Sequence, residues 1–150
     1  MVFEEVNPDD VPVELLLEAD PSEANIQSYL SGGWCFAARE QDRIVGACIV
    51  KTISDRCVEI FNVSVMPELQ GRGIGTQLLN YVLDGLAQRS IKRVELGTGT
   101  FGYQLTFYQR LGFRVSDVIT NHFLDHYPEP IFEHGIQHKD MLRLYLDLVD

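Results

Sequence analysis

The sequence has no long apolar run, few cysteines and few basic residues. No apolar stretch reaches the roughly 18 residues that a membrane-spanning helix needs, so we expect no membrane span. The three cysteines cannot all pair with one another, and the acidic start Met1–Glu5 lacks the basic residues of a secretory signal. We therefore expect reduced thiols and a cytoplasmic location.

Basic side chains are outnumbered by acidic ones, 12 Lys and Arg against 22 Asp and Glu, which gives a net charge of −10. Nucleic-acid phosphates would be repelled by such a protein, whereas cationic small molecules would be attracted. The length of 150 residues is that of a single domain, and the sequence has no internal repeats or low-complexity segments. We expect one domain over residues 1–150.

A strand, a glycine-rich turn and a helix follow one another in the middle of the chain. Val58–Val65 has the β-branched and apolar composition of a buried strand, and Met66-Pro67 ends it because proline cannot continue a central ladder. Gln70–Thr76 (Gln-Gly-Arg-Gly-Ile-Gly-Thr) then contains three glycines. An apolar repeat with helical period begins at Ile74 and predicts a helix to about residue 89.

Glycines at the start of a helix allow an anion to approach its unpaired N–H groups, which also carry the positive end of the helix dipole. A Walker phosphate loop is excluded because Gly-Lys-Ser/Thr is missing. The dinucleotide-binding fingerprint requires a glycine where Thr76 stands. A turn that serves only tight strand–helix packing is the structural alternative.

The segment Gln70–Gly75 resembles the Gln/Arg-x-x-Gly-x-Gly/Ala motif of the GNAT superfamily of acetyl-CoA-dependent N-acetyltransferases. Phe107–Phe113 (Phe-Tyr-Gln-Arg-Leu-Gly-Phe) is similar to the family's downstream Leu-Tyr-x-x-x-Gly-Phe. The resemblance implies an α/β (α+β) fold with a mixed, mostly antiparallel sheet of six to seven strands and about four helices. It also implies acetyl-CoA as acyl donor, with these cofactor-binding residues: Val63, Val65, Gln70, Gly71, Arg72, Gly73, Ile74, Gly75, Thr76, Thr98, Thr100 and Tyr108.

Strands are also expected at residues 34–39 and 44–53, joined by a turn at Gln41-Asp42. If this turn has two residues, Cys35 faces Cys48 on the neighbouring strand. We interpret both as buried thiols without redox function.

The remaining elements are shorter. Asn7 and Asp20 are expected to cap helices, with Glu23 completing a capping box after Asp20. Residues 93–96 form a strand that, in a GNAT fold, runs parallel to Val58–Val65 and splays from it. A helix ended by Gly112, and strands at 113–119 and 141–148, complete the fold.

The resemblance gives Tyr108 the role of proton donor to the leaving thiolate, because a phenol is protonated at neutral pH. Backbone N–H groups near Val63 and Val65 would polarise the acetyl carbonyl. Alternation places Glu59 on the same strand face as these valines, either as a base acting through water or as a solvated carboxylate. An asparagine of the family that contacts the cofactor is replaced by Phe101.

Four side chains are expected to bind the acceptor, on the segments that the GNAT fold places there: Tyr29, Trp34, Tyr127 and Glu133. The tail holds the histidine pairs His122/His126 and His134/His138, whose four-residue spacing suits zinc only on helices. Breaks at Pro128, Pro130 and Gly135 argue against a metal site, so none is predicted. The tail also resembles that of a small bacterial branch of GNAT proteins with largely unassigned substrates.

These features predict transfer of acetyl from acetyl-CoA to a primary amine of a small molecule or peptide, by direct attack in a ternary complex. A GNAT-fold module that binds acyl-CoA without turnover is the alternative, and Tyr108 counts against it. A nucleotide-binding or NAD-binding protein is disfavoured by Thr76. GNAT proteins are often dimers, so a homodimer is possible.

Overall fold

The computed structural model describes residues 1–148, which divide into two compact units, Met1–Lys92 with Leu148, and Arg93–Asp147. The first unit contains β1 (Val2–Val6), the 3-10 turn η1 (Pro8–Asp10), α1 (Val13–Leu16), α2 (Glu23–Leu30), β2 (Trp34–Glu40), β3 (Arg43–Ser54), β4 (Cys57–Val65), the 3-10 turn η2 (Pro67–Leu69) and α3 (Ile74–Gln88). The second contains β5 (Arg93–Gly99), α4 (Tyr103–Arg110), β6 (Arg114–Ile119), α5 (His122–His126), β7 (Phe132–Glu133), β8 (Ile136–Gln137) and β9 (Met141–Asp147).

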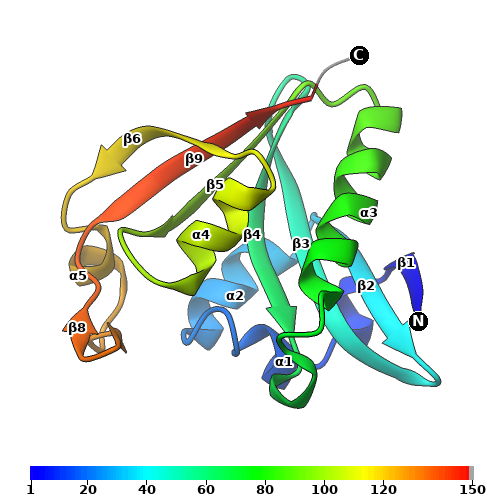
Figure 1. The fold of residues 1–150 in the computed structure, drawn as a ribbon, viewed down its shortest axis with the longest axis horizontal. Helices are drawn as coiled ribbons and strands as arrows, with labels where there is room; N and C mark the ends of the chain where they lie inside the picture. The colour runs from blue at the N-terminus through cyan, green and yellow to red at the C-terminus, as the bar shows by residue number, and fades with distance from the viewer. Residues whose placement is uncertain (149–150) are drawn as a thin grey trace. The chain divides into compact units, whose positions relative to one another are not determined.

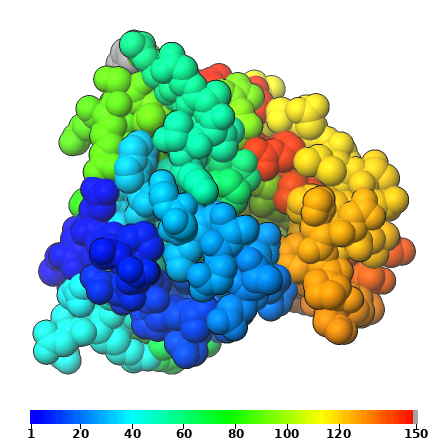
Figure 2. Space-filling model, turned by 180° about the vertical axis from the view of Figure 1, so that it is seen from behind, coloured from blue at the N-terminus to red at the C-terminus, as the bar shows by residue number. Residues whose placement is uncertain are grey.

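In the first unit, β1–β4 form antiparallel pairs in chain order, and helices cover both faces of the four strands (Figures 1 and 2). Side-chain alternation along β2 sorts its residues between the two faces. Cys35 and Ala37 pack in the core cluster of α1 and α2. Phe36 lies edge-on to Tyr81 of α3, and Ala38 shares a cluster with Ile74 at the start of α3.

The predicted pairing of Cys35 with Cys48 is wrong. Glu40 does face Arg43, but the register shifts between Ala38 and Arg39, and Val45 is the extra residue of a β-bulge between Ile44 and Gly46. Cys35 therefore faces Ile49, and Cys48 faces Phe36. Because the faces alternate, the two thiols lie on opposite faces of the sheet.

Two helix starts also differ in detail from the prediction. Asn7 caps only the short turn η1, where its side chain accepts a hydrogen bond from the backbone N–H of Asp9. The cap of α2 is Ser22, whose hydroxyl accepts from the N–H of Asn25. Asp20 instead accepts from the N–H of Ser22, and its side chain is buried. The cap predicted at Asp20 is therefore at Ser22, and no contact of Glu23 completes a capping box among the described residues.

In the second unit β9 lies between β5 and β6 and is antiparallel to both (Figure 1). Val94, Leu96 and Leu144 are buried, as is Phe113, which follows the glycine that ends α4. The sheet strand β5 is longer than predicted, since it continues through Gly97 to Gly99.

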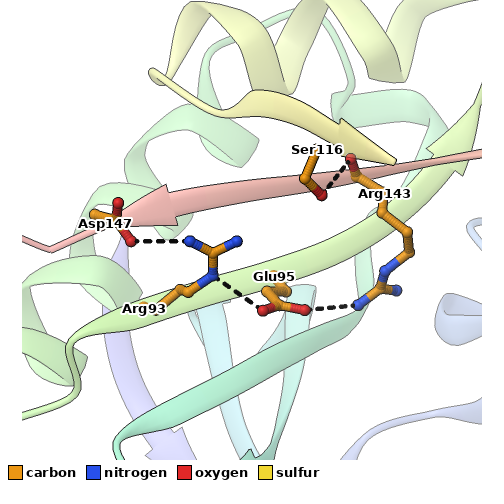
Figure 3. Close-up of polar contacts among 5 residues, drawn as sticks. All are labelled: Arg93, Glu95, Ser116, Arg143 and Asp147. Atoms are coloured by element: carbon orange, nitrogen blue, oxygen red, sulfur yellow. Dashed lines mark hydrogen bonds and ion pairs between the residues drawn. The ribbon is translucent and has the colours of Figure 1, made fainter. Parts of the chain in front are cut away.

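The opposite face of β5 and β9 carries a chain of ion pairs (Figure 3). Glu95 receives hydrogen bonds from Arg93 at 3.0 Å and from Arg143 at 3.3 Å, and Arg93 also contacts Asp147. Burial alone would raise the pKa of Glu95, but the two guanidinium groups outweigh it and hold this pKa below its usual value. The guanidinium of Arg93 also stacks on Tyr145 at 4.2 Å. Glu95 is therefore an ion-paired structural carboxylate.

The two units supply seven strands of main sheet among the described residues, the upper end of the predicted number. Five α-helices are present there, one more than predicted, because the tail forms α5 before the small β7–β8 hairpin. No helix of residues 1–148 is long and apolar enough to cross a membrane. A single domain over residues 1–150 stays a prediction, and residues 149–150 lie outside the described part.

Candidate active site

The glycine-rich segment after β4 has the backbone conformation that only glycine adopts readily. Gly71 and Gly73 have φ angles of +79° and +83°, in the left-handed region. A Cβ at Gly71 would have no neighbour within 4 Å, and one at Gly73 would meet only the Gln77 amide at 4.0 Å. These glycines therefore serve an exposed turn and a helix start, and the alternative of tight strand–helix packing does not explain them.

The helix α3 begins at Ile74, directly after this turn. Its N-cap is Gly73, which has no side chain to accept from these groups, and its first turn contains no acidic residue. The N–H groups of Ile74, Gly75 and Thr76 have no partner within the helix, and the dipole of this 15-residue helix adds positive potential there. The arrangement is suited to a phosphate group.

Gln70 fixes the turn to the end of β4. Its side-chain amide donates a hydrogen bond to the carbonyl oxygen of Val65 at 2.9 Å. Gln70 was predicted from the sequence to bind the cofactor, and in the structure it also makes this contact within the chain. Arg72 is exposed, and Val63 and Val65 are half-buried on β4.

Tyr108 lies in α4 of the second unit and is 6% exposed. Its ring makes edge contacts with Phe107 and Phe113, at centroid distances of 5.2 and 5.8 Å. Gly112, with φ of +103°, ends the helix as predicted. In the preceding segment Thr98 is buried in β5, whereas Thr100 is exposed.

Phe101, which replaces the family's asparagine, stacks on the ring of His138 with centroids 4.2 Å apart and an interplanar angle of 8°. The replacement is visible in the sequence, whereas its partner His138 was not predicted. The four-residue histidine spacing drew attention to a metal, and it gave no signal for a stacking role.

Glu59 lies on β4 opposite Lys51 of β3. The residues at 59, 61, 63 and 65 are half-buried and those between them are buried, so the predicted alternation is confirmed. Phe61 on the same face stacks on Tyr29 at 5.2 Å.

Tyr29 is buried and belongs to a polar network that the sequence reasoning missed. Its hydroxyl donates to Asp20 at 3.0 Å and accepts from the Asn62 amide at 3.0 Å. Asn62 in turn accepts from the hydroxyl of Ser64. The signal was present, because Asn62 and Ser64 are polar residues at alternate positions of an otherwise apolar strand, and such residues need partners when buried.

The other expected acceptor residues have partners of their own. The ring of Trp34 lies under the guanidinium of Arg89, at 4.8 Å from its centroid. Tyr127 is half-buried beside Phe123, with centroids 5.9 Å apart. Glu133 accepts a hydrogen bond from Nε2 of His138 at 2.8 Å.

Of the two histidine pairs, only His122 and His126 share a helix, with ring centroids 4.5 Å apart. The pKa of His122 is lowered mainly by burial of its ring and, to a smaller extent, by repulsion from His126. His134 instead lies in the turn between β7 and β8, and His138 directly follows β8. No group of three His, Cys, Asp or Glu side chains within residues 1–148 is arranged to hold a metal ion.

Comparison with known proteins assigns the chain to a family. A family model described as "Acetyltransferase (GNAT) family" matches residues 2–113. An uncharacterised N-acetyltransferase of Bacillus subtilis is 40% identical over 146 residues, which are 97% of this chain and 93% of that protein. The chain therefore belongs to the GNAT acetyltransferase family.

Solved structures agree with this assignment. An IAA acetyltransferase from Bacillus cereus is 35% identical, with a TM-score of 0.93 over 98% of this chain and 99% of that one. A GNAT family acetyltransferase from Elizabethkingia anophelis with acetyl-CoA bound is 36% identical, with a TM-score of 0.92 over 98% and 97% of the two chains. The predicted GNAT fold is confirmed.

A test of the α3 site is the substitution Gly75→Asp, which places a carboxylate at the start of α3. The charge is compatible with the helix dipole, so the fold should survive, but it would repel a pyrophosphate from the same N–H groups. We expect the affinity for acetyl-CoA, measured by calorimetry, to fall roughly tenfold or more. Gly85→Asp is the matched control, because Gly85 lies farther along α3 and its Cβ would meet nothing within 4 Å. Equal affinities of the two variants would exclude this anion site.

The cysteines generate a second prediction. Burial, helped by Asp10 and Glu5, raises the pKa of Cys35 to about 12, and burial raises that of Cys48 further. Such thiols are poor nucleophiles because the thiolate is scarcely populated. Intact-protein mass spectrometry after incubation with acetyl-CoA alone should show no acetylated cysteine. An adduct that an added amine discharges would instead establish a covalent acetyl-enzyme.

Proposed function

We propose that this protein transfers the acetyl group of acetyl-CoA directly to a primary amine of a small molecule or peptide. The observation that supports this most strongly is the α3 start, where two left-handed glycines and an uncapped helix leave N–H groups for a pyrophosphate. The similarity to a GNAT structure with acetyl-CoA bound supports the same donor. The cofactor contacts proposed are those of Gln70–Thr76, with Val63, Val65, Thr98, Thr100 and Tyr108.

The chemistry would proceed in a ternary complex. The amine nitrogen attacks the thioester carbonyl, a C–N bond forms and the C–S bond breaks. N–H groups near Val63 and Val65 would stabilise the negative charge that develops on the carbonyl oxygen. The CoA thiolate would take a proton from Tyr108, and the amine would lose its proton to solvent, directly or through a water held by Glu59. The phenol is then reprotonated from solvent.

The acceptor is proposed to be a cation. The net charge of −10 attracts such a molecule, and Tyr29, Trp34, Tyr127 and Glu133 were assigned to its binding. The structure limits what two of these can do, because Tyr29 is only 4% exposed and the ring of Trp34 is already stacked with Arg89. Tyr127 and the Glu133 carboxylate, whose side chain is 35% exposed, are the stronger candidates.

A module that binds acyl-CoA without turnover remains the second candidate. A screen that measures thiol release from acetyl-CoA over a panel of amines distinguishes the two, since only an enzyme releases CoA in proportion to the acetylated amine. Absence of release with every amine, alongside tight acetyl-CoA binding, would favour the binding module.

A cytoplasmic location, a single domain over residues 1–150 and a possible homodimer are part of the same proposal. Cys35, Cys48 and Cys57 are buried and form no disulfide within the described part of the chain, which is compatible with a reducing compartment. Partners other than acetyl-CoA and the amine, nucleic acid and membranes in particular, are not proposed.

Tyr108→Phe tests the proton donor. Removal of one hydroxyl should lower kcat by roughly 10²–10⁴-fold, the usual value of general acid catalysis, with little change in acetyl-CoA affinity. Tyr103→Phe is the control, because Tyr103 lies in the same helix and is 69% exposed. Steady-state kinetics with a substrate from the screen measures both. A kcat unchanged in Tyr108→Phe would leave the tyrosine a packing role only.

The acceptor class is tested by comparing polyamines and aminoglycosides with amino acids and other carboxylated amines. Cationic acceptors should have the lower KM, and their KM should rise with added salt because salt screens the attraction. The rate should also rise with pH up to the apparent pKa of the amine or base, since attack requires the neutral amine. Carboxylated amines that react better, without a salt effect, would contradict a cationic acceptor.

A further inference from the structure

Three glycines around the β5–α4 turn are in contact with side chains of the tail. A Cβ at Gly97 would lie 2.3 Å from the sulfur of Met141, and one at Gly99 would lie 2.4 Å from Nδ1 of His138. A Cβ at Gly102 would lie 2.5 Å from a carboxylate oxygen of Glu133. No side chain other than hydrogen fits at these positions without displacing the tail, so the tail is packed directly on the backbone of this turn.

Glu133 and His138 form a hydrogen-bonded pair at this contact. Nε2 of His138 donates to Oε1 of Glu133 at 2.8 Å, which fixes the proton on Nε2 in the neutral ring. The other nitrogen, Nδ1, is buried and has no hydrogen-bond partner within the described residues. Phe101 also stacks on the imidazole ring, and the ring of Phe123 lies 5.6 Å away at an interplanar angle of 50°. The His138 side chain is only 9% exposed, so its ring is a packing element.

The tail that presents this pair is itself held by backbone contacts. The N–H of Phe123 donates to the carbonyl of Lys139 at 2.9 Å, and the N–H of His138 donates to that of Ile131 at 2.8 Å. Asp140 accepts from the N–H of Asn121. Residues 121–140 therefore form an ordered segment, with Glu133 in β7 and His138 directly after β8.

The start of α4 has few stabilising contacts of its own, so we expect it to depend on this segment. The helix has only eight residues, its N-cap Gly102 has φ of +105°, and no side chain caps its first N–H groups. A helix of this length is marginal by itself. The Glu133 carboxylate lies against Gly102, where the helix dipole favours a negative charge.

We propose that the Glu133–His138 pair and Phe101 are positioning residues that hold the β5–α4 turn, and through it the orientation of Tyr108, for acetyl transfer. The inference rests on the proposed role of Tyr108 in catalysis. It connects two features that were separate in the sequence, the replacement of the family's asparagine by Phe101 and the histidine in the tail. The stacking of Phe101 on His138 connects this turn to the tail.

The first test is hydrogen exchange, which is read without turnover. His138→Phe retains a ring that can stack on Phe101 but removes the hydrogen bond to Glu133. We expect amides of residues 103–110 to exchange about tenfold faster in this variant, while those of α3 keep their rates. The variant Glu133→Gln should exchange like the parent, because its amide oxygen still accepts from Nε2. Parental exchange in His138→Phe, or equally fast exchange in Glu133→Gln, would overturn the proposal.

The second test is kinetic. In His138→Phe and Glu133→Ala, kcat should fall roughly tenfold, as expected for a misplaced catalytic group, with little change in the KM for acetyl-CoA. A rise in the KM for acetyl-CoA without a fall in kcat would contradict positioning of Tyr108. Failure of Tyr108→Phe to alter kcat, together with faster α4 exchange in His138→Phe, would reject the acid role and keep the anchor.

Two glycine variants distinguish the effect of a steric clash with Glu133 from the effect of backbone strain at a positive φ. Gly102 has a positive φ, and the Cβ added by Gly102→Ala would meet Glu133. Gly135 also has a positive φ, +76°, but the Cβ added by Gly135→Ala would have no neighbour within 4 Å. Faster exchange of α4 and lower kcat are expected for Gly102→Ala only. Equal effects of the two variants would show that strain alone is responsible, which would also overturn the inference.

Discussion

The proposed chemistry depends on one constraint, the presence of unpaired N–H groups at the start of α3. Two glycines with left-handed φ angles turn the chain, and neither supplies a side chain that could cap the helix. Gln70 holds this turn to Val65, the last residue of β4. The strand therefore fixes where the helix begins, and the helix dipole makes that point attractive to an anion. A helix N-terminus can attract an anion through its N–H groups alone, which is compatible with so acidic a protein.

Features with a strong local signal were predictable from the sequence. The strand, glycine turn and helix from Val58 to Gln88 have unambiguous periodicity, and Pro67 and Gly112 end elements for steric reasons. The spaced glycines and the segment around Tyr108 indicated the family from the sequence alone. These features depend on neighbours within a few positions in the chain, so their physical cause is contained in the sequence itself.

Features that depend on distant partners were not predictable. The sequence of the β2–β3 hairpin contains no signal for the bulge at Val45. Because of this bulge, Cys35 faces Ile49 and not Cys48. The burial of Asp20 requires Tyr29, Asn25 and Ser22, and only their meeting in space shows why a carboxylate is tolerated there. Likewise Phe101 and His138 are far apart in the sequence, and nothing in either segment indicates that their rings stack.

The bulge has a consequence for the oxidation chemistry of the protein. Cys35 and Cys48 lie on adjacent strands, where an unshifted register would have placed their sulfur atoms side by side. With Val45 inserted, one thiol points toward α1 and α2, and the other points toward the face that α3 covers. A disulfide requires Cβ atoms about 4 Å apart on the same side, so the two could be cross-linked only after the hairpin separates. One extra residue in a strand thus prevents a disulfide between Cys35 and Cys48 in the folded first unit.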